Sequence, residues 1–133
     1  MPNYRTTLDA YEQAYQRYKQ LPSRAHLDAW LEQTHALHLA LLLPGRFPLG
    51  QVLTTPGALD AMDAGEHIPP EFLLRHKHGD WGDLDAHDRR VNAEALRLGH
   101  RLLSVYATRV GERLWVITEA DRSETTLLLP GEY

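Results

Sequence analysis

The chain has 133 residues, no cysteine and a net charge of −4 at pH 7. A length of this order suits one domain, and the lack of cysteine excludes a disulfide framework or a thiolate metal site. Its 14 Lys and Arg and 18 Asp and Glu form no basic block, which argues against nucleic acid as the partner, although a basic patch can still assemble in the fold.

Membrane insertion and secretion are not expected. The longest apolar run, Leu39 to Pro44, is far shorter than the ~20 residues of a membrane span. The first residues, from Met1 to Arg5, carry no signal-peptide pattern. We therefore expect a cytoplasmic protein with no membrane partner.

Residues 1–46 are expected to form a helical hairpin. Tyrosine and leucine side chains recur every three or four residues in the first half, which is the period of an α-helix. These positions are Tyr4, Leu8, Tyr11, Tyr15 and Tyr18. Pro22 ends this helix and Ser23 caps the next. The short turn between the two helices predicts that they pack antiparallel.

Short helices are expected between residues 55 and 99. Each begins at a capping residue or a proline, and the third is closed by Gly99. Their first residues are Thr55, Ile68 and Asp85. Residues 49–53 fit either a short strand or an extended segment, and residues 78–83, which contain two glycines, fit a loop.

The last third is predicted to form a three-stranded antiparallel meander. Three runs are rich in β-branched and aliphatic residues, and the short linkers between them allow only antiparallel neighbours. These runs are residues 101–108, 113–119 and 125–129. The middle run is apolar on both faces, which predicts cover on both sides of the sheet. Helices within residues 56–98 can cover one face, and the N-terminal hairpin or a second copy of the chain, in a homodimer, is expected to cover the other.

The expected fold class is therefore α+β. It consists of an N-terminal helical hairpin, short helices and then the C-terminal meander. We expect residues 1–133 to form a single domain, in which residues 1–46 are a helical-hairpin extension and residues 47–133 are the α+β core.

Several motifs in this core are shared with a known group of proteins. They lie at Gly50–Leu59, Glu71–His76, Gly79–Gly82, Ile117–Ser123 and Thr125–Tyr133. On these motifs the chain resembles a family of short, uncharacterised bacterial proteins carried on plasmids, phages and integrated elements. The resemblance implies a mobile-element setting, and labels on relatives that mention restriction–modification reflect genomic neighbourhood. It supplies no established chemistry.

A metal site is not predicted. His76, His78 and Asp80 offer two imidazoles and a carboxylate. However, histidines two positions apart diverge in a helix and point to opposite faces in a strand, whereas a metal needs three converging ligands. We expect neither a metal nor another cofactor.

The turn between the last two predicted strands is the most chemically suggestive stretch. A Glu119 base, an Arg122 to stabilise a phosphorane and a His76 acid would suffice for metal-independent RNA cleavage. The structural alternative is a polar β-turn in which Asp121 and Ser123 bond the backbone and Arg122 pairs with a nearby acid.

Two aromatic groups are candidate binding elements. The glycine-bracketed loop with Asp80 and Trp81 is either a binding loop or a segment whose tryptophan fills the core. The tyrosine stripe and Trp30 are either a partner-binding face or ordinary hairpin packing. The candidate binding residues are Tyr11, Tyr15, Tyr18, Trp30, Asp80, Trp81, Asp121 and Arg122.

The function we expect is that of a small non-enzymatic protein-binding factor of a mobile genetic element, one that interferes with or regulates a host defence system. The negative charge, the lack of a convincing catalytic set and the aromatic hairpin favour this interpretation. The alternative is a metal-independent ribonuclease-like toxin that uses His76, Glu119 and Arg122.

Overall fold

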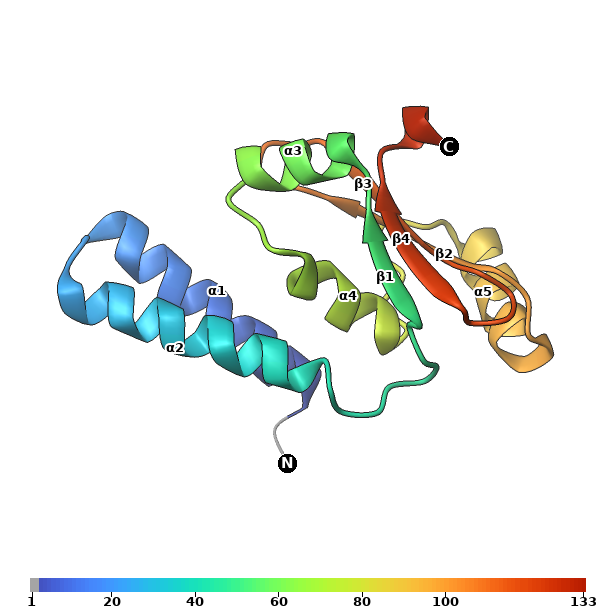
Figure 1. The fold of residues 1–133 in the computed structure, drawn as a ribbon, viewed down its shortest axis with the longest axis horizontal. Coiled ribbons are helices and arrows are strands. Elements are labelled where there is room, and N and C mark those ends of the chain that lie inside the picture. Colours follow the sequence, from blue (N-terminus) through green and yellow to red (C-terminus); the bar gives the residue numbers. More distant parts are fainter. Residues whose placement is uncertain (1–2) are drawn as a thin grey trace. The chain divides into compact units, whose positions relative to one another are not determined.

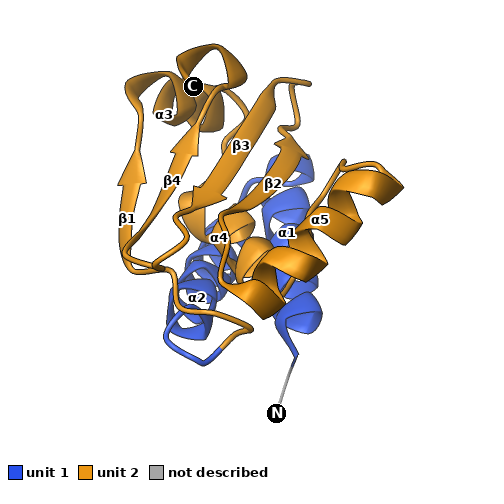
Figure 2. Cartoon of the chain, turned by 90° about the vertical axis from the view of Figure 1, so that its right-hand side faces the viewer, with its two compact units in different colours: residues 1–44 blue, residues 45–133 orange. Residues whose placement is uncertain are grey.

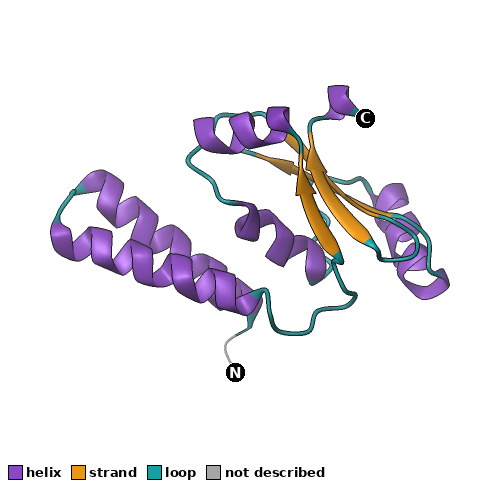
Figure 3. Ribbon diagram, viewed as in Figure 1, coloured by secondary structure: helices purple, strands orange, loops and turns teal. Residues whose placement is uncertain are grey.

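A computed structural model describes residues 3–133 and gives an α+β fold of five α-helices and a four-stranded mixed sheet (Figures 1 and 3). The chain divides into two compact units, residues 1–44 and residues 45–133 (Figure 2). The division falls close to the predicted boundary between the hairpin extension and the core.

The first unit is the predicted helical hairpin. It consists of α1 (Tyr4–Gln20) and α2 (Arg24–Ala40). Ser23 caps α2 as expected, because its hydroxyl accepts the backbone N–H of His26 at 3.0 Å. The two helices pack through aromatic rings, and the Trp30 ring lies 5.2 Å from Tyr15 and 5.4 Å from Tyr18 between centroids.

The second unit contains the sheet. Its strands are β1 (Gln51–Thr54), β2 (Leu102–Ala107), β3 (Arg113–Thr118) and β4 (Glu124–Leu128), in the spatial order β1-β4-β3-β2. The antiparallel pairing of β2 with β3 and of β3 with β4 confirms the predicted order of these strands. The prediction of a three-stranded antiparallel meander is wrong, because β1 adds a fourth strand parallel to β4.

The parallel pairing of β1 depends on a close approach to the turn before β4. The Gln51 amide donates to the Ser123 carbonyl at 2.9 Å, and the Thr55 amide to the Leu127 carbonyl at 3.0 Å. Gly50 has a φ of +66°, and a Cβ at this position would collide with the Ser123 carbonyl. The long crossover from β1 to β4 contains all the remaining helices, which is what a parallel pairing requires.

The crossover helices begin where the sequence predicts. They are α3 (Pro56–Ala64), α4 (Pro69–Lys77) and α5 (Ala86–Leu98), and a 3-10 turn, η1 (Pro130–Glu132), follows β4. The Thr55 hydroxyl accepts the amide of Ala58, and the Asp85 carboxylate accepts that of Asp88. Gly99 ends α5 in the left-handed conformation, with a φ of +76°.

Segments that are distant from β2 in the sequence cover its outer edge. The Val105 amide donates to the Trp81 carbonyl at 3.1 Å, and the Val105 carbonyl accepts the Asp83 amide at 2.7 Å. The Asn92 side chain of α5 bonds both the amide and the carbonyl of Leu103, at 3.2 and 2.5 Å. These bonds hold α5 beside β2 (Figure 2).

The hydrophobic core of the second unit contains the aromatic residue of the predicted loop. Trp81 is only 7% exposed and packs in a cluster with Phe47, Ala95 and Leu102. The cluster joins the segment before β1 to α5 and β2. Within the described residues, no helix is both long and apolar enough to cross a bilayer.

Candidate functional site

His76, the predicted acid, lies in the interior between α4 and the sheet. Its side chain is 0% exposed. Its Nδ1 atom lies 2.5 Å from the Ser104 hydroxyl and its Nε2 atom 2.9 Å from the Thr118 hydroxyl. Burial, with a smaller contribution from the charge of Arg122, lowers the pKa of His76 from 6.5 to about 3. The imidazole is therefore neutral at pH 7.

The donors and acceptors of the hydrogen bonds around His76 can be assigned in only one way. Thr125 donates its hydroxyl to the Leu49 carbonyl at 2.7 Å, so it accepts from the Thr118 hydroxyl, which lies 2.7 Å away. Thr118 must then accept from His76, which fixes the proton on Nε2, and Nδ1 accepts from Ser104. Both ring nitrogens are therefore hydrogen-bonded. This series of hydrogen bonds connects α4, the sheet and the segment before β1.

Arg122 is also held in structural contacts. Its guanidinium donates to the carbonyls of His100 (2.6 Å), Glu119 (3.1 Å) and Ala95 (3.3 Å). Its own backbone has a φ of +61°, in the left-handed region. The residue therefore joins the β3–β4 turn to the end of α5, in place of the predicted pairing with an acid.

The rest of the β3–β4 turn has the polar-turn character described above. The Asp121 carboxylate accepts the amide of Ser123 at 2.9 Å, and bonding to Ser123 lowers the pKa of Asp121 below its usual value. Glu119 is 38% exposed and faces Arg101 at 3.3 Å. His76 is thus enclosed, whereas Glu119 is at the surface.

The loop with Asp80 and Trp81 has structural contacts throughout. The Asp80 carboxylate accepts two bonds from Arg75, at 2.8 and 3.3 Å, and one from the amide of Gly82. The Asp80 carbonyl accepts the Tyr106 hydroxyl at 2.6 Å. Trp81 faces the core, as described above, so neither side chain is presented as a ligand group.

The aromatic residues of the hairpin are packed to different degrees. Tyr11 and Tyr15 are buried, whereas Tyr18 and Trp30 are half-buried. The rings of Tyr15, Tyr18 and Trp30 contact one another within the hairpin. The tyrosine stripe, a candidate partner-binding face, therefore contributes in part to hairpin packing.

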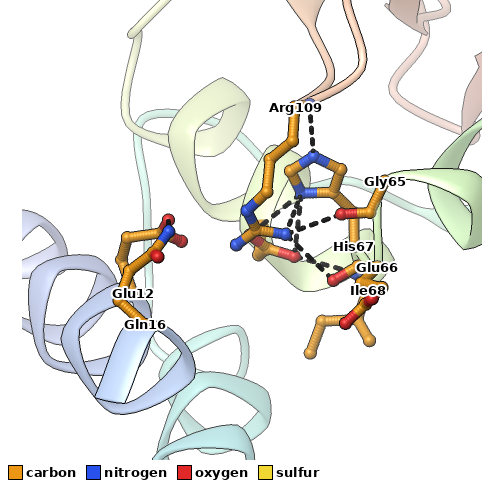
Figure 4. Close-up of polar contacts among 8 residues, drawn as sticks. Glu12, Gln16, Gly65, Glu66, His67, Ile68 and Arg109 are labelled. Atoms are coloured by element: carbon orange, nitrogen blue, oxygen red, sulfur yellow. Dashed lines mark hydrogen bonds and ion pairs between the residues drawn. The ribbon is translucent and has the colours of Figure 1, made fainter. Parts of the chain in front are cut away.

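His67 and Glu71 form a His–carboxylate pair that has no recognisable sequence pattern. Arg109 of the β2–β3 turn contacts this pair, and Figure 4 shows its contacts with His67 and the neighbouring backbone. His67 Nε2 accepts the Arg109 amide at 2.9 Å, so Nδ1 carries the proton that faces Glu71 at 3.2 Å. Arg109 also donates to the carbonyls of Gly65 and Glu66. Because a backbone amide occupies Nε2, this pair has no nitrogen available to act as a base.

A concavity lies along the exposed side of α5. It has a volume of about 390 Å³, and five of its lining residues, at positions i, i+3, i+4, i+7 and i+8, lie on one face of the helix. The lining residues are His87, Arg90, Val91, Glu94, Ala95, His100 and Arg101. We call this concavity the α5 groove. The helical spacing of its α5 residues can be read from the sequence, and His100 and Arg101 follow the Gly99 that ends this helix.

The rim of the α5 groove is organised around Arg101. Its guanidinium pairs with the Glu119 carboxylate at 3.3 Å and donates to the hydroxyl of Tyr133. The charge of Glu119 is the main cause of a raised Arg101 pKa. The Tyr133 ring also packs edge-on against Trp115, at 5.8 Å. The C-terminal residue thereby fixes the position of a groove arginine.

More positively charged than negatively charged side chains line the α5 groove. Two arginines, Arg90 and Arg101, line it against one carboxylate, Glu94, which is paired with Arg97 at 2.6 Å. Between its charged residues, Val91 is 50% exposed, and Leu98 farther along α5 is 51% exposed. Within residues 3–133, no three His, Asp or Glu side chains are placed to hold a metal ion.

Comparison of the chain with protein-family models, curated proteins and solved structures found no match.

Proposed function

We propose that this chain is a non-enzymatic protein-binding factor and that it holds an acidic segment of its partner in the α5 groove. The observation that carries the proposal is a division of roles among the polar residues. His76 and Arg122, two of the groups suited to acid–base chemistry, are engaged in structural bonds, whereas exposed charged residues line the α5 groove. Exposed residues on a rigid scaffold are common in recognition sites.

The state of His76 argues against the ribonuclease-like alternative. A general acid must be protonated near the working pH and must reach the leaving group. His76 is enclosed and neutral at pH 7, and Arg122 already donates to backbone carbonyls. Neither residue has the access that cleavage of a polymer would need.

The character of the α5 groove favours a protein partner. Arg90 and Arg101 supply positive charge, and the half-exposed Val91 and Leu98 supply apolar surface beside it. Single strands of nucleic acid are usually held by exposed aromatic side chains and a cationic groove in a basic domain. The chain instead has a net charge of −4, which would repel a polyanion at long range but not at a local basic site.

The biological setting that we propose follows from the family resemblance. Proteins carried on plasmids and phages encounter host defence systems, and a small binding factor can act on such a system by occupying one of its surfaces. We therefore propose that the partner belongs to a host defence system, which this protein inhibits or regulates.

The experiment that tests the proposal is site-specific photo-crosslinking in bacterial cells. A photo-reactive amino acid at Arg90 should give one discrete protein adduct, and the same group at Val110 should not. Val110 is a matched control because it is 57% exposed and lies in the turn at the opposite end of β2.

The adduct at position 90 must also depend on the groove charge. Purified partner should bind the wild type and bind His87→Glu or Arg101→Glu several-fold more weakly, because like charges then face each other. Equal adducts at positions 90 and 110, or no adduct at either, would reject the α5 groove as the binding site.

A further inference from the structure

The two edge strands of the sheet, β2 and β1, differ in whether other segments hydrogen-bond to their outer edge. The edge of β2 is covered by the Trp81–Asp83 segment and by the Asn92 side chain. Among residues 3–133, no hydrogen bond reaches the outer edge of β1. An uncovered strand edge presents unpaired amide and carbonyl groups, which natural proteins usually protect.

The direction of the β1 backbone groups follows from its pairing with β4. In a parallel pair, alternate residues of a strand bond the neighbour. The amides of Gln51 and Thr55 donate to β4, so the ladder uses the odd-numbered residues of β1. The amide and carbonyl groups of Val52 and Thr54 therefore point away from the sheet.

We propose that β1 pairs antiparallel with β1 of a second copy of the chain, across a two-fold axis at Leu53. In this register Val52 of one copy faces Thr54 of the other, and each such pair exchanges both its N–H···O bonds. Leu53 then faces Leu53 of the second copy in the non-hydrogen-bonded pair. This is the register that uses both outward-facing residues of each strand.

The composition of the segment favours a second copy as the occupant. Residues 47–55 contain no charged side chain, so two copies meet without electrostatic repulsion. Val52 is 42% and Leu53 38% exposed, which leaves apolar surface on both faces of the strand for the partner to cover. Antiparallel pairing of identical strands is isologous and closes at two copies, whereas a head-to-tail contact could continue into filaments. The joined sheet would have eight strands.

A single introduced cysteine tests this register, because the natural chain contains none. In the proposed pair the two Cα atoms at position 53 lie about 4.5 Å apart, within the range that a disulfide spans. Leu53→Cys should therefore give a disulfide-linked dimer under mild oxidation. Val52→Cys is the matched control, because its own copies would lie roughly 8 Å apart, beyond disulfide reach.

A charge exchange tests the same contact without a covalent bond. Leu53→Lys should be monomeric by size-exclusion chromatography with light scattering, and so should Leu53→Glu. An equimolar mixture of the two variants should restore a dimer that high salt weakens. Position 53 is partly exposed, so urea midpoints close to that of the wild type would show that both variants are folded.

Three results would overturn the proposal. The first is a wild type that remains monomeric at millimolar concentration while Leu53→Cys forms no disulfide. The second is a dimer that crosslinks equally through positions 52 and 53. The third is crosslinking of Leu53→Cys in cells to a different protein only, which would make β1 an edge for a foreign strand.

Discussion

The Nε2 atom of His76 lies 2.9 Å from the hydroxyl oxygen of Thr118, and that oxygen lies 2.7 Å from the hydroxyl of Thr125. The hydroxyls of Thr118 and Thr125 thus connect the Nε2 side of the imidazole to the carbonyl of Leu49. Such a network stabilises the neutral ring, because protonation of Nδ1 would reverse its bond with the Ser104 hydroxyl and place a charge in an enclosed site.

This relationship predicts that acid destabilises the protein through His76. Between pH 6.5 and about 3, the unfolded chain binds a proton at this residue and the folded chain does not. The contribution is therefore complete above pH 6.5 and is lost as the pH falls toward 3, by on the order of 5 kcal/mol in all. Urea unfolding at pH 7, 5 and 4 should show a smaller pH slope for His76→Gln than for the wild type.

The tautomer of His76 gives an independent check. We expect ¹⁵N chemical shifts of the imidazole to report a neutral ring protonated at Nε2, unchanged from pH 7 to pH 5. A ring that titrates near pH 6.5 would contradict the enclosed network.

A second prediction concerns Arg122. Arg122→Ala should lower the free energy of unfolding by about 2–3 kcal/mol, because it removes charged donors from several carbonyls. Arg122→Gly should be more stable than Arg122→Ala by about 1 kcal/mol, since glycine accepts the φ of +61° without a Cβ clash. Equal urea midpoints for the two variants would show that the backbone conformation is not strained.

A third prediction separates stability from binding at the groove rim. The Arg101–Glu119 pair is partly exposed, so Arg101→Ala and Glu119→Gln should each change the free energy of unfolding by less than about 1 kcal/mol. Their effects on the crosslinked partner should be opposite. Arg101→Ala weakens binding of an acidic segment, whereas Glu119→Gln strengthens it by leaving the Arg101 charge uncompensated.

The Glu119→Gln variant also distinguishes a binding protein from a ribonuclease. If Glu119 were a general base, Glu119→Gln would abolish any RNA cleavage by the purified protein and any toxicity of its expression. We expect neither effect, and a Glu119-dependent loss of either activity would support the ribonuclease-like alternative.

Local signals in the sequence located the helices. Ser23, Thr55 and Asp85 accept the amides expected of N-caps, because capping depends on residues only three apart. The pairing of β1 with β4 could not be read in this way. Its four residues are compatible with several structures, and the choice of a partner about 70 residues later depends on tertiary packing.

The candidate site was harder to predict than the fold for a related reason. Residue type suggested chemistry for His76 and Arg122, but burial and backbone contacts decide their roles. The α5 groove combines one face of the helix with His100 and Arg101, which follow the left-handed Gly99, and the Asn92 bonds hold this helix beside β2. Neither the burial of His76 nor the packing of α5 against β2 has a local sequence pattern.

The last prediction concerns the hairpin, residues 1–44. The aromatic core cluster and the His76 network lie entirely within residues 45–133. We therefore expect a chain of residues 45–133 to fold cooperatively and to retain the His76-dependent pH slope. The isolated hairpin should be only partly helical, since two short helices without a larger core are marginal in water.

Tryptophan fluorescence can follow the two units separately. Trp81 and Trp115 lie in the second unit and Trp30 in the first, so Trp30→Phe in the full chain gives the matched reference for the truncated one. If the hairpin covers apolar surface of the sheet, truncation should lower the free energy of unfolding at about 25 cal/mol per Å² exposed. A truncated chain without a cooperative transition would show that residues 1–133 fold as one domain, whereas an unchanged midpoint would leave the hairpin aromatics free to serve a partner.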